Sequence, residues 1–311
     1  MKNLGKLFLP LSLFVASIIG FSSCKSDDTT TVAPKDITDV AIADPQFSTL
    51  VAALTKAELV TTLKGTGPFT VFAPNNAAFT KAGITSLDNQ TKASLTPILT
   101  SHVLSGTVKA ADVKSGRAGT VNAGNDIYLS KNADGVFING NIKVIATDVT
   151  ASNGVIHVID NVIMPAKDNL VTIASNNPNF SELVSLVVGA DPAVAAALTN
   201  ASANGLTVFA PTNAAFTELY KTTPKATLLA NRTLLTNVLL YHVVPGRVFS
   251  TDLPNVGTME VQTALSTGKL SFDLAGGAKV KGKTSGNSNI TAANILGTNG
   301  VIHVIDKVLL P

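Results

Sequence analysis

The strongest constraint on the fold is an internal repeat, because one long stretch of sequence occurs twice in this chain of 311 residues. Three blocks return in the same order in the second half: PFTVFAPNNAAF at 68–79 and GLTVFAPTNAAF at 205–216, LTSHVLSG at 99–106 and LLYHVVPG at 239–246, and NGVIHVIDNVIMP at 153–165 and NGVIHVIDKVLLP at 299–311. A repeat of this length is a whole domain rather than a short solenoid unit. The sequence therefore predicts two similar domains, residues 36–165 and 168–311, with Ala166 and Lys167 as the linker.

Within each unit, helical patterns come before strand patterns. Asp44-Pro45 offers a helix N-cap followed by proline at the first helical position, and apolar residues then recur at helical spacing up to Leu63. Later stretches are β-type and broken by Gly, Asn and Asp, and residues 155–159 are apolar on both faces apart from His157. Such a run is typical of a central strand. The order of the patterns predicts an α+β domain.

Residues 1–23 have the pattern of a secretory leader. Lys2 and Lys6 precede an apolar run, residues 7–21, that is short for a membrane span, and Ser22 and Ser23 come directly before Cys24. The segment 21–24 resembles a bacterial lipobox, with Phe21 where leucine is usual, so we expect lipidation of Cys24. The alternative is a plain secretory signal that leaves a free cysteine.

Residues 24–35 are polar and predict a flexible tether between the anchor and the first domain. The first four residues after Cys24 resemble the surface-export signal of Bacteroidetes lipoproteins, although an ordinary hydrophilic spacer would look the same. We therefore expect an outer-membrane lipoprotein of the cell envelope, either exposed at the surface or periplasmic. Its contact with the membrane would be through the lipid anchor only.

Composition excludes several classes of function. The net charge is only +3 and charged residues make up 14% of the chain, so no strong field is present to attract nucleic acid. A single cysteine excludes multi-cysteine metal sites, iron–sulfur clusters and intrachain disulfides. We expect neither a cofactor nor a nucleic-acid partner.

The three repeated blocks resemble the fasciclin domain, and the resemblance covers nearly all of the chain after the leader. It implies two tandem domains, each a wedge-shaped β-sandwich with packed helices. It also implies a role in cell adhesion and extracellular matrix contact without catalysis. The second copy keeps the family's Tyr-His pair as Tyr241-His242, whereas the first has Ser101-His102, which puts in doubt any contact that the tyrosine makes there.

All four histidines, His102, His157, His242 and His303, lie in repeated blocks. A catalytic or ligand-carrying interpretation would make them general bases or metal ligands. However, the chain has no HExxH element, no Gly-x-Ser-x-Gly element and no glycine-rich phosphate loop. The favoured interpretation is structural, with each ring hydrogen-bonded to buried backbone.

Two surface elements are candidates for adhesion contacts. In some animal members of the family, an Asp-Ile pair before the final strand is linked to integrin recognition, and this chain has Asp148-Val149 and Asn294-Ile295 there. The alternative is an ordinary turn at the entry to a strand.

The second candidate is a row of three alternating lysines, Lys279, Lys281 and Lys283, which could bind an acidic polysaccharide or protect a sheet edge from aggregation.

Three functions remain open from the sequence. The favoured one is a non-catalytic lipoprotein that binds a matrix protein, a cell-surface protein or a polysaccharide. The others are a structural envelope protein that associates with its own kind, and an enzyme or small-ligand carrier that uses the repeated histidines.

Overall fold

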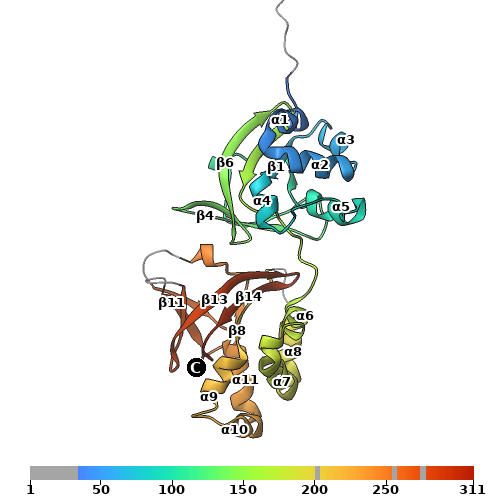
Figure 1. Ribbon diagram of the computed structural model, residues 1–311. Coiled ribbons are helices and arrows are strands. Elements are labelled where there is room, and N and C mark those ends of the chain that lie inside the picture. The colour runs from blue at the N-terminus through green and yellow to red at the C-terminus, as the bar shows by residue number, and fades with distance from the viewer. Residues whose placement is uncertain (1–33, 200–203, 254–257, 274–277) are drawn as a thin grey trace, which may run out of the picture. The chain divides into compact units, whose positions relative to one another are not determined.

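The structure is a computed structural model that describes residues 34–199, 204–253, 258–273 and 278–311 (Figure 1). The predicted leader, Cys24 and the tether up to residue 33 lie outside the described residues. The two copies of the repeat form two domains with the same order of elements, apart from one additional helix, Lys225–Ala230, in the second. We call the elements from α1 to β7 the first domain and those from α6 to β14 the second domain.

The first domain begins with helices, as the sequence pattern predicts. Asp36, Asn75 and Thr91 accept hydrogen bonds from the first turns of α1, α4 and α5 and so fix where these helices begin. Its helices are α1 (Ile37–Ala43), η1 (Pro45–Phe47), α2 (Ser48–Lys56), α3 (Val60–Leu63), α4 (Asn76–Lys81), α5 (Lys92–Thr100) and η2 (Ala110–Asp112). Its strands are β1 (Phe69–Pro74), β2 (Val103–Ser105), β3 (Gly116–Ala118), β4 (Ile127–Asn132), β5 (Gly135–Ile138), β6 (Ile142–Ala151) and β7 (Gly154–Ile159).

These seven strands form one sheet in the order β2-β1-β7-β6-β5-β4-β3. Strand β7 runs parallel to β1 and antiparallel to β6, and all its residues from Val155 to Ile159 are buried. The apolar run therefore forms a central strand, as its lack of alternation predicts.

Both faces of the sheet are apolar. One face packs beneath the helices, where Leu50, Leu95 and Ile156 belong to a single buried cluster. On the other face, Phe72 of β1 and Ile138 of β5 share a second cluster, so the sheet curls over and encloses its own core. The result is an α+β domain in which a β-sandwich carries helices on one side, as expected.

The second domain repeats this plan with the strand order β10-β11-β12-β13-β14-β8-β9. Its helices are α6 (Leu170–Ser175), η3 (Pro178–Phe180), α7 (Ser181–Gly189), α8 (Pro192–Thr199), α9 (Asn213–Leu219), α10 (Lys225–Ala230), α11 (Arg232–Tyr241) and η4 (Ser250–Asp252). Its strands are β8 (Leu206–Pro211), β9 (Val243–Pro245), β10 (Thr258–Gln262), β11 (Lys269–Asp273), β12 (Lys279–Gly282), β13 (Gly286–Gly297) and β14 (Gly300–Ile305).

The two domains differ most in their helices. The eight residues of α8 stand where the first domain has the four-residue α3. In Figure 1, α6, α7 and α8 lie together on one side of the second domain.

Among the described residues, no single helix has the length and apolar character needed to cross a membrane. One pair, Pro178–Gly189 with Pro192–Thr199, passes the same test of length and composition but is bent by 120°.

Candidate functional site

The segment just before the final strand has the same unusual backbone in both domains. Asp148 in β6 and Asn294 in β13 have φ values of 60° and 62°, and each lies at an irregularity in strand pairing. Asp and Asn tolerate this left-handed conformation better than other residues with a side chain. The two backbone N–H groups donate to Nδ1 of His157 and His303, at 3.3 and 3.4 Å. The bulge is therefore tied to the buried histidine of the neighbouring strand.

The second ring nitrogen of these histidines binds another segment of backbone. Nε2 of His157 lies 2.8 Å from the carbonyl oxygen of Val108, and Nε2 of His303 lies 2.8 Å from that of Val248. Since Nδ1 accepts a hydrogen bond, Nε2 must carry the proton and the ring is neutral. Burial lowers the pKa of His303, which favours the same neutral form.

His102 and His242, which lie just after α5 and α11, also form hydrogen bonds through both ring nitrogens. Nδ1 of His102 donates to the carbonyl oxygen of Ile98 at 2.8 Å, and Nε2 accepts from the backbone N–H of Ile163 at 2.9 Å. His242 makes the same pair of bonds at 2.7 and 2.9 Å. Burial lowers the pKa of each ring to about 4. All four histidines thus use both nitrogens on backbone groups, and the described residues contain no cluster of three potential metal ligands.

In the first domain the bulge is open to solvent. Asp148 is exposed, and its Oδ1 accepts a hydrogen bond of 3.0 Å from the backbone N–H of Ala110. The neighbouring side chain of Val149 is 37% exposed. We call this surface, formed by η2 with Asp148 and Val149, the first-domain bulge face. It presents a carboxylate on a fixed backbone beside an apolar side chain.

In the second domain the corresponding surface is closed. Asn294 is only 6% exposed, and its Oδ1 accepts a hydrogen bond of 2.9 Å from the backbone N–H of Ser250. Its Nδ2 donates to the carbonyl oxygen of Gly140, a first-domain residue, at 2.8 Å. Ile295 is partly buried in the second-domain core. Of this predicted contact pair, Asn294 is therefore covered by the first domain, and Ile295 packs mainly within its own domain.

The contact between the two domains that covers Asn294 has Tyr128 of β4 at its centre. Nη1 of Arg247 donates to its hydroxyl at 2.7 Å, and the guanidinium carbon lies 4.7 Å from the ring centre. The ring of Phe249 lies 5.7 Å away on centroids. These three residues were not singled out from the sequence. The sequence difference that could have indicated them is the change from Thr107 and Lys109 in the first copy to Arg247 and Phe249 in the second.

Two further hydrogen bonds join β4 of the first domain to η4 of the second. The hydroxyl of Ser130 donates to the carboxylate of Asp252, and Nδ2 of Asn132 donates to the carbonyl oxygen of Thr251 at 3.1 Å. The strand β4 of the first domain thus lies against η4 of the second.

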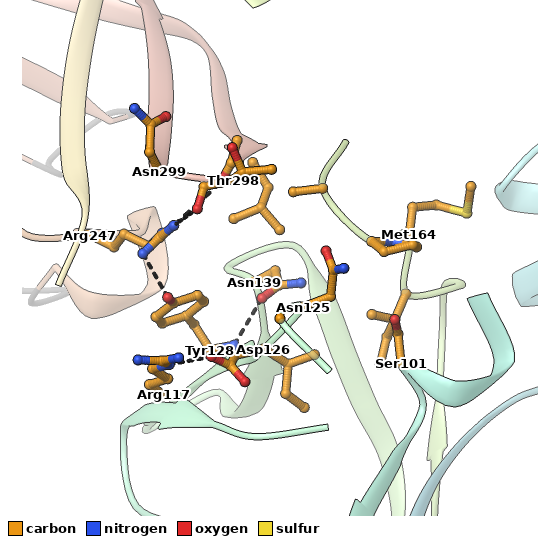
Figure 2. A pocket seen from close by; sticks show the side chains of 17 residues that line it. Ser101, Arg117, Asn125, Asp126, Tyr128, Asn139, Met164, Arg247, Thr298 and Asn299 are labelled. Carbon is orange, nitrogen blue, oxygen red and sulfur yellow. Dashed lines mark hydrogen bonds and ion pairs between the residues drawn. The ribbon is translucent and has the colours of Figure 1, made fainter. Parts of the chain in front are cut away.

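A polar pocket of about 360 Å³ lies beside this contact (Figure 2). Arg117 and Asp126 form an ion pair on one side, and on the other Nη2 of Arg247 donates to the carbonyl oxygen of Thr298 at 2.7 Å. The Nε of Arg247 is buried and has no hydrogen-bond partner among the described residues. Burial lowers the pKa of Arg247. Most polar groups that line the pocket are already bonded within their own domain, and the bond from Arg247 to Tyr128 joins the two domains.

Two of the three lysines, Lys279 and Lys281, lie on a strand inside the sheet, and Lys283 directly follows this strand. Strand β12 pairs with β11 on one side and β13 on the other, so the interpretation of these lysines as protection of a sheet edge is wrong. The partners of β12 are the strands directly before and after it in the sequence, and alternation of residue types within one strand does not reveal whether both of its sides are paired. Lys281 and Lys283 are exposed and alternate with buried Val280 and Gly282, while Lys279 is half-buried.

Tyr241 connects the last helix to this part of the sheet. It is fully buried, its hydroxyl donates to the carbonyl oxygen of Lys269 at 2.6 Å, and it accepts from the backbone N–H of Lys283 at 2.9 Å. Ser101 is too short for such contacts and instead accepts from Nδ2 of Asn122 at 2.9 Å. The first copy thus replaces the tyrosine contact with a local one.

Comparison with known proteins gives consistent matches. The model of the fasciclin domain family matches residues 45–165 and 178–311. Protein sll1483 of Synechocystis sp. is 45% identical over 133 residues, which make up 42% of this chain and 73% of that protein. Human periostin is 26% identical over 272 residues, or 88% of this chain, but the match spans only 31% of periostin. A solved FAS1 domain pair from the insect cell adhesion molecule fasciclin I covers 88% of this chain at 20% identity, with a TM-score of 0.43.

Proposed function

Because the chain belongs to the fasciclin domain family, whose members are linked to cell adhesion and extracellular matrix binding, we propose that it is a non-catalytic binding protein of the cell envelope. Its partner would be a matrix protein, a cell-surface protein or a polysaccharide. The observation that carries this proposal is the difference between the two copies of one surface. The bulge is exposed at Asp148 and buried at Asn294.

The chemistry of the first-domain bulge face suits protein recognition. The backbone N–H of Ala110 holds one carboxylate oxygen of Asp148, and the other has no hydrogen-bond partner among the described residues. A carboxylate with a spare oxygen can accept a charge-assisted hydrogen bond or complete the coordination of a partner's cation. Val149 adds an apolar contact next to it. Because the bulge fixes the backbone, little conformational entropy is lost on binding.

The lysines of β12 support a second mode of binding, to an acidic polysaccharide. Lys281 in β12 and Lys283 in the turn that follows are both exposed. Their attraction to an anionic polymer would fall with added salt, because exposed charges are screened. Protein recognition at Asp148 would depend on its geometry as well as its charge.

The alternatives have less support. A catalytic or carrier role for the histidines would need an available ring nitrogen, yet all four rings use both nitrogens on backbone groups. A purely structural envelope protein that binds its own kind would use the same exposed faces and is separated by identifying the partner after crosslinking on intact cells.

We also propose that Cys24 carries the lipid anchor and places the protein at the outer membrane, on the cell surface or in the periplasm. The support is the leader sequence and the single cysteine that follows it. Protease treatment of intact cells tests the side of the membrane. Loss of the protein would indicate surface exposure, and survival until lysis would indicate the periplasm.

Retention of the purified mature protein on matrix proteins, cells and envelope polysaccharides tests the binding proposal. Asp148→Asn should reduce retention on a protein surface several-fold, because it removes the charge and keeps the shape. Asp88→Asn, at an exposed carboxylate in the loop before α5, is the matched control and should have no effect. Retention on none of these surfaces, or equal retention of the Asp148→Asn variant, would contradict the proposal.

A further inference from the structure

The helical side of the second domain contains an apolar cavity of about 200 Å³. Its walls come from α6, α7 and α8, and β8 and the end of α11 form its floor. At the same place in the first domain, the cavity beneath α1, α2 and α3 measures only about 20 Å³. The two domains share one fold, so the difference arises from their side chains.

Equivalent positions can be assigned from matching hydrogen bonds. Nδ2 of Asn153 donates to the carbonyl oxygen of Leu63 at 2.8 Å, and Nδ2 of Asn299 donates to that of Leu198 at 2.8 Å. The end of α8 therefore corresponds to the end of α3. The floors correspond too, because His102 lines the small cavity and His242 lines the large one.

The substitutions between the copies enlarge the space and remove polar groups. Val187 stands in α7 where α2 has Leu54, which is one methylene larger. The wall provided by α8 carries Ala195, a residue too small to fill the gap. Val171 replaces Thr38 in the first of the three helices. An empty apolar cavity lowers stability in proportion to its volume, so a domain gains nothing from this space unless it is filled.

The cavity opens to solvent at an apolar rim. Val188 of α7 lines it and is 81% exposed, whereas the first domain has Thr55 at this position. Ser175 is the one hydroxyl in the lining and is exposed. An exposed valine at the mouth gives an apolar ligand a continuous path from the surface to the interior.

The lining defines the class of ligand. His242 is the only ionisable group among the lining residues, and both of its ring nitrogens are bonded to backbone. A charged or strongly polar ligand would lose its hydration without gaining a partner. An apolar cavity of about 150 Å³ accepts benzene, so this slightly larger one, lined by leucine, valine and alanine, suits a chain of about eight carbons. We propose that the second domain binds an uncharged aliphatic chain in this cavity.

Titration of the full chain with 1-octanol tests this proposal. Binding should shift the NMR methyl signals of Val187, Val194 and Leu198 and raise the unfolding temperature of the second domain, because a ligand of the native state stabilises it. The first domain should not respond. Absence of saturable shifts, or shifts confined to the first domain, would overturn the proposal.

Filling the cavity provides the matched comparison. Val187→Phe should weaken 1-octanol binding by about tenfold or more, since a buried aromatic ring occupies much of the space. Val121→Phe makes the same change at a 43% exposed valine of the first domain and should leave binding unchanged. If the Val187→Phe chain is not folded by circular dichroism, Ala195→Leu blocks the cavity from α8 instead. Unchanged affinity in a folded filled variant would also overturn the proposal.

Discussion

Lowering the pH from 7 to 5 should destabilise both domains, because each contains a fully buried histidine that is neutral when folded. Burial lowers the pKa of His102 and His242 from 6.5 to about 4. The unfolded chain therefore binds a proton more readily than the folded one between these values. The contribution of each ring is complete above pH 6.5 and is lost as the pH falls towards 4.

The size of the effect follows from the shift. A lowering of the pKa from 6.5 to about 4 corresponds to about 3 kcal/mol for each histidine below pH 4. Near pH 5, where the unfolded ring is almost fully protonated and the folded ring is not, each of these two rings should lower the stability of its domain by about 1 kcal/mol per pH unit as the pH falls. Carboxylates with lowered pKa values, such as Asp36 and Asp306, act mainly below this window because their ordinary value is 3.8.

Urea unfolding at pH 7, 6 and 5 and constant ionic strength, followed by circular dichroism, measures this slope. His102→Gln should lower the stability of the first domain at pH 7, because two backbone hydrogen bonds are disturbed, and should also flatten its pH dependence. The second domain, which keeps His242, serves as the internal reference. A flat profile in the original chain, or an equal slope in the variant, would refute the argument.

Two substitutions test contacts that shape each domain and their junction. Tyr241→Phe leaves the carbonyl of Lys269 and one backbone N–H without their partner and should cost about 1–3 kcal/mol of second-domain stability in urea unfolding. Gly140→Ala should loosen the junction, because a Cβ there would lie 2.7 Å from an atom of Asn294. Gly83→Ala is its control in thermal unfolding and limited proteolysis, since Gly83 has a similar φ of 77° and open space around it.

Much of the fold could be predicted from the repeated blocks. The unbroken apolar run around His157 predicted a central strand, and β7 has that position because both its faces are covered. The structure also gives a physical reason for the repeated Asn-Gly before this strand. Asn153 bonds both α1 and the end of α3, and Gly154 has a φ of 156° with the Phe69 backbone close by.

The difference between the two bulges could not be predicted from their own residues. Asp148 and Asn294 have the same backbone and bond the equivalent histidine, so local sequence describes both alike. What separates them is the packing of Tyr128 against Arg247, two residues far apart in the chain. The edge interpretation of the lysines in and after β12 was wrong for a different reason, because β12 pairs with both of its neighbours in the sequence and alternation within one strand does not indicate this.

The cavity of the second domain was also beyond sequence reasoning. The alanines of α8 are ordinary helix formers, and their small volume has a consequence only when the opposing residue is Val187 rather than leucine. A void depends on the sum of several side chains from different elements, and no single position indicates it.

The most direct test of the account compares two equivalent backbone amides by hydrogen exchange. The N–H of Ala110 donates to Asp148 in the open bulge face, and the N–H of Ser250 donates to Asn294 in the covered one. Ser250 should exchange much more slowly than Ala110, and Gly140→Ala should bring its rate towards that of Ala110. Equal rates in the original chain would contradict the claim that one copy of this surface is used for docking and the other is left open for a partner.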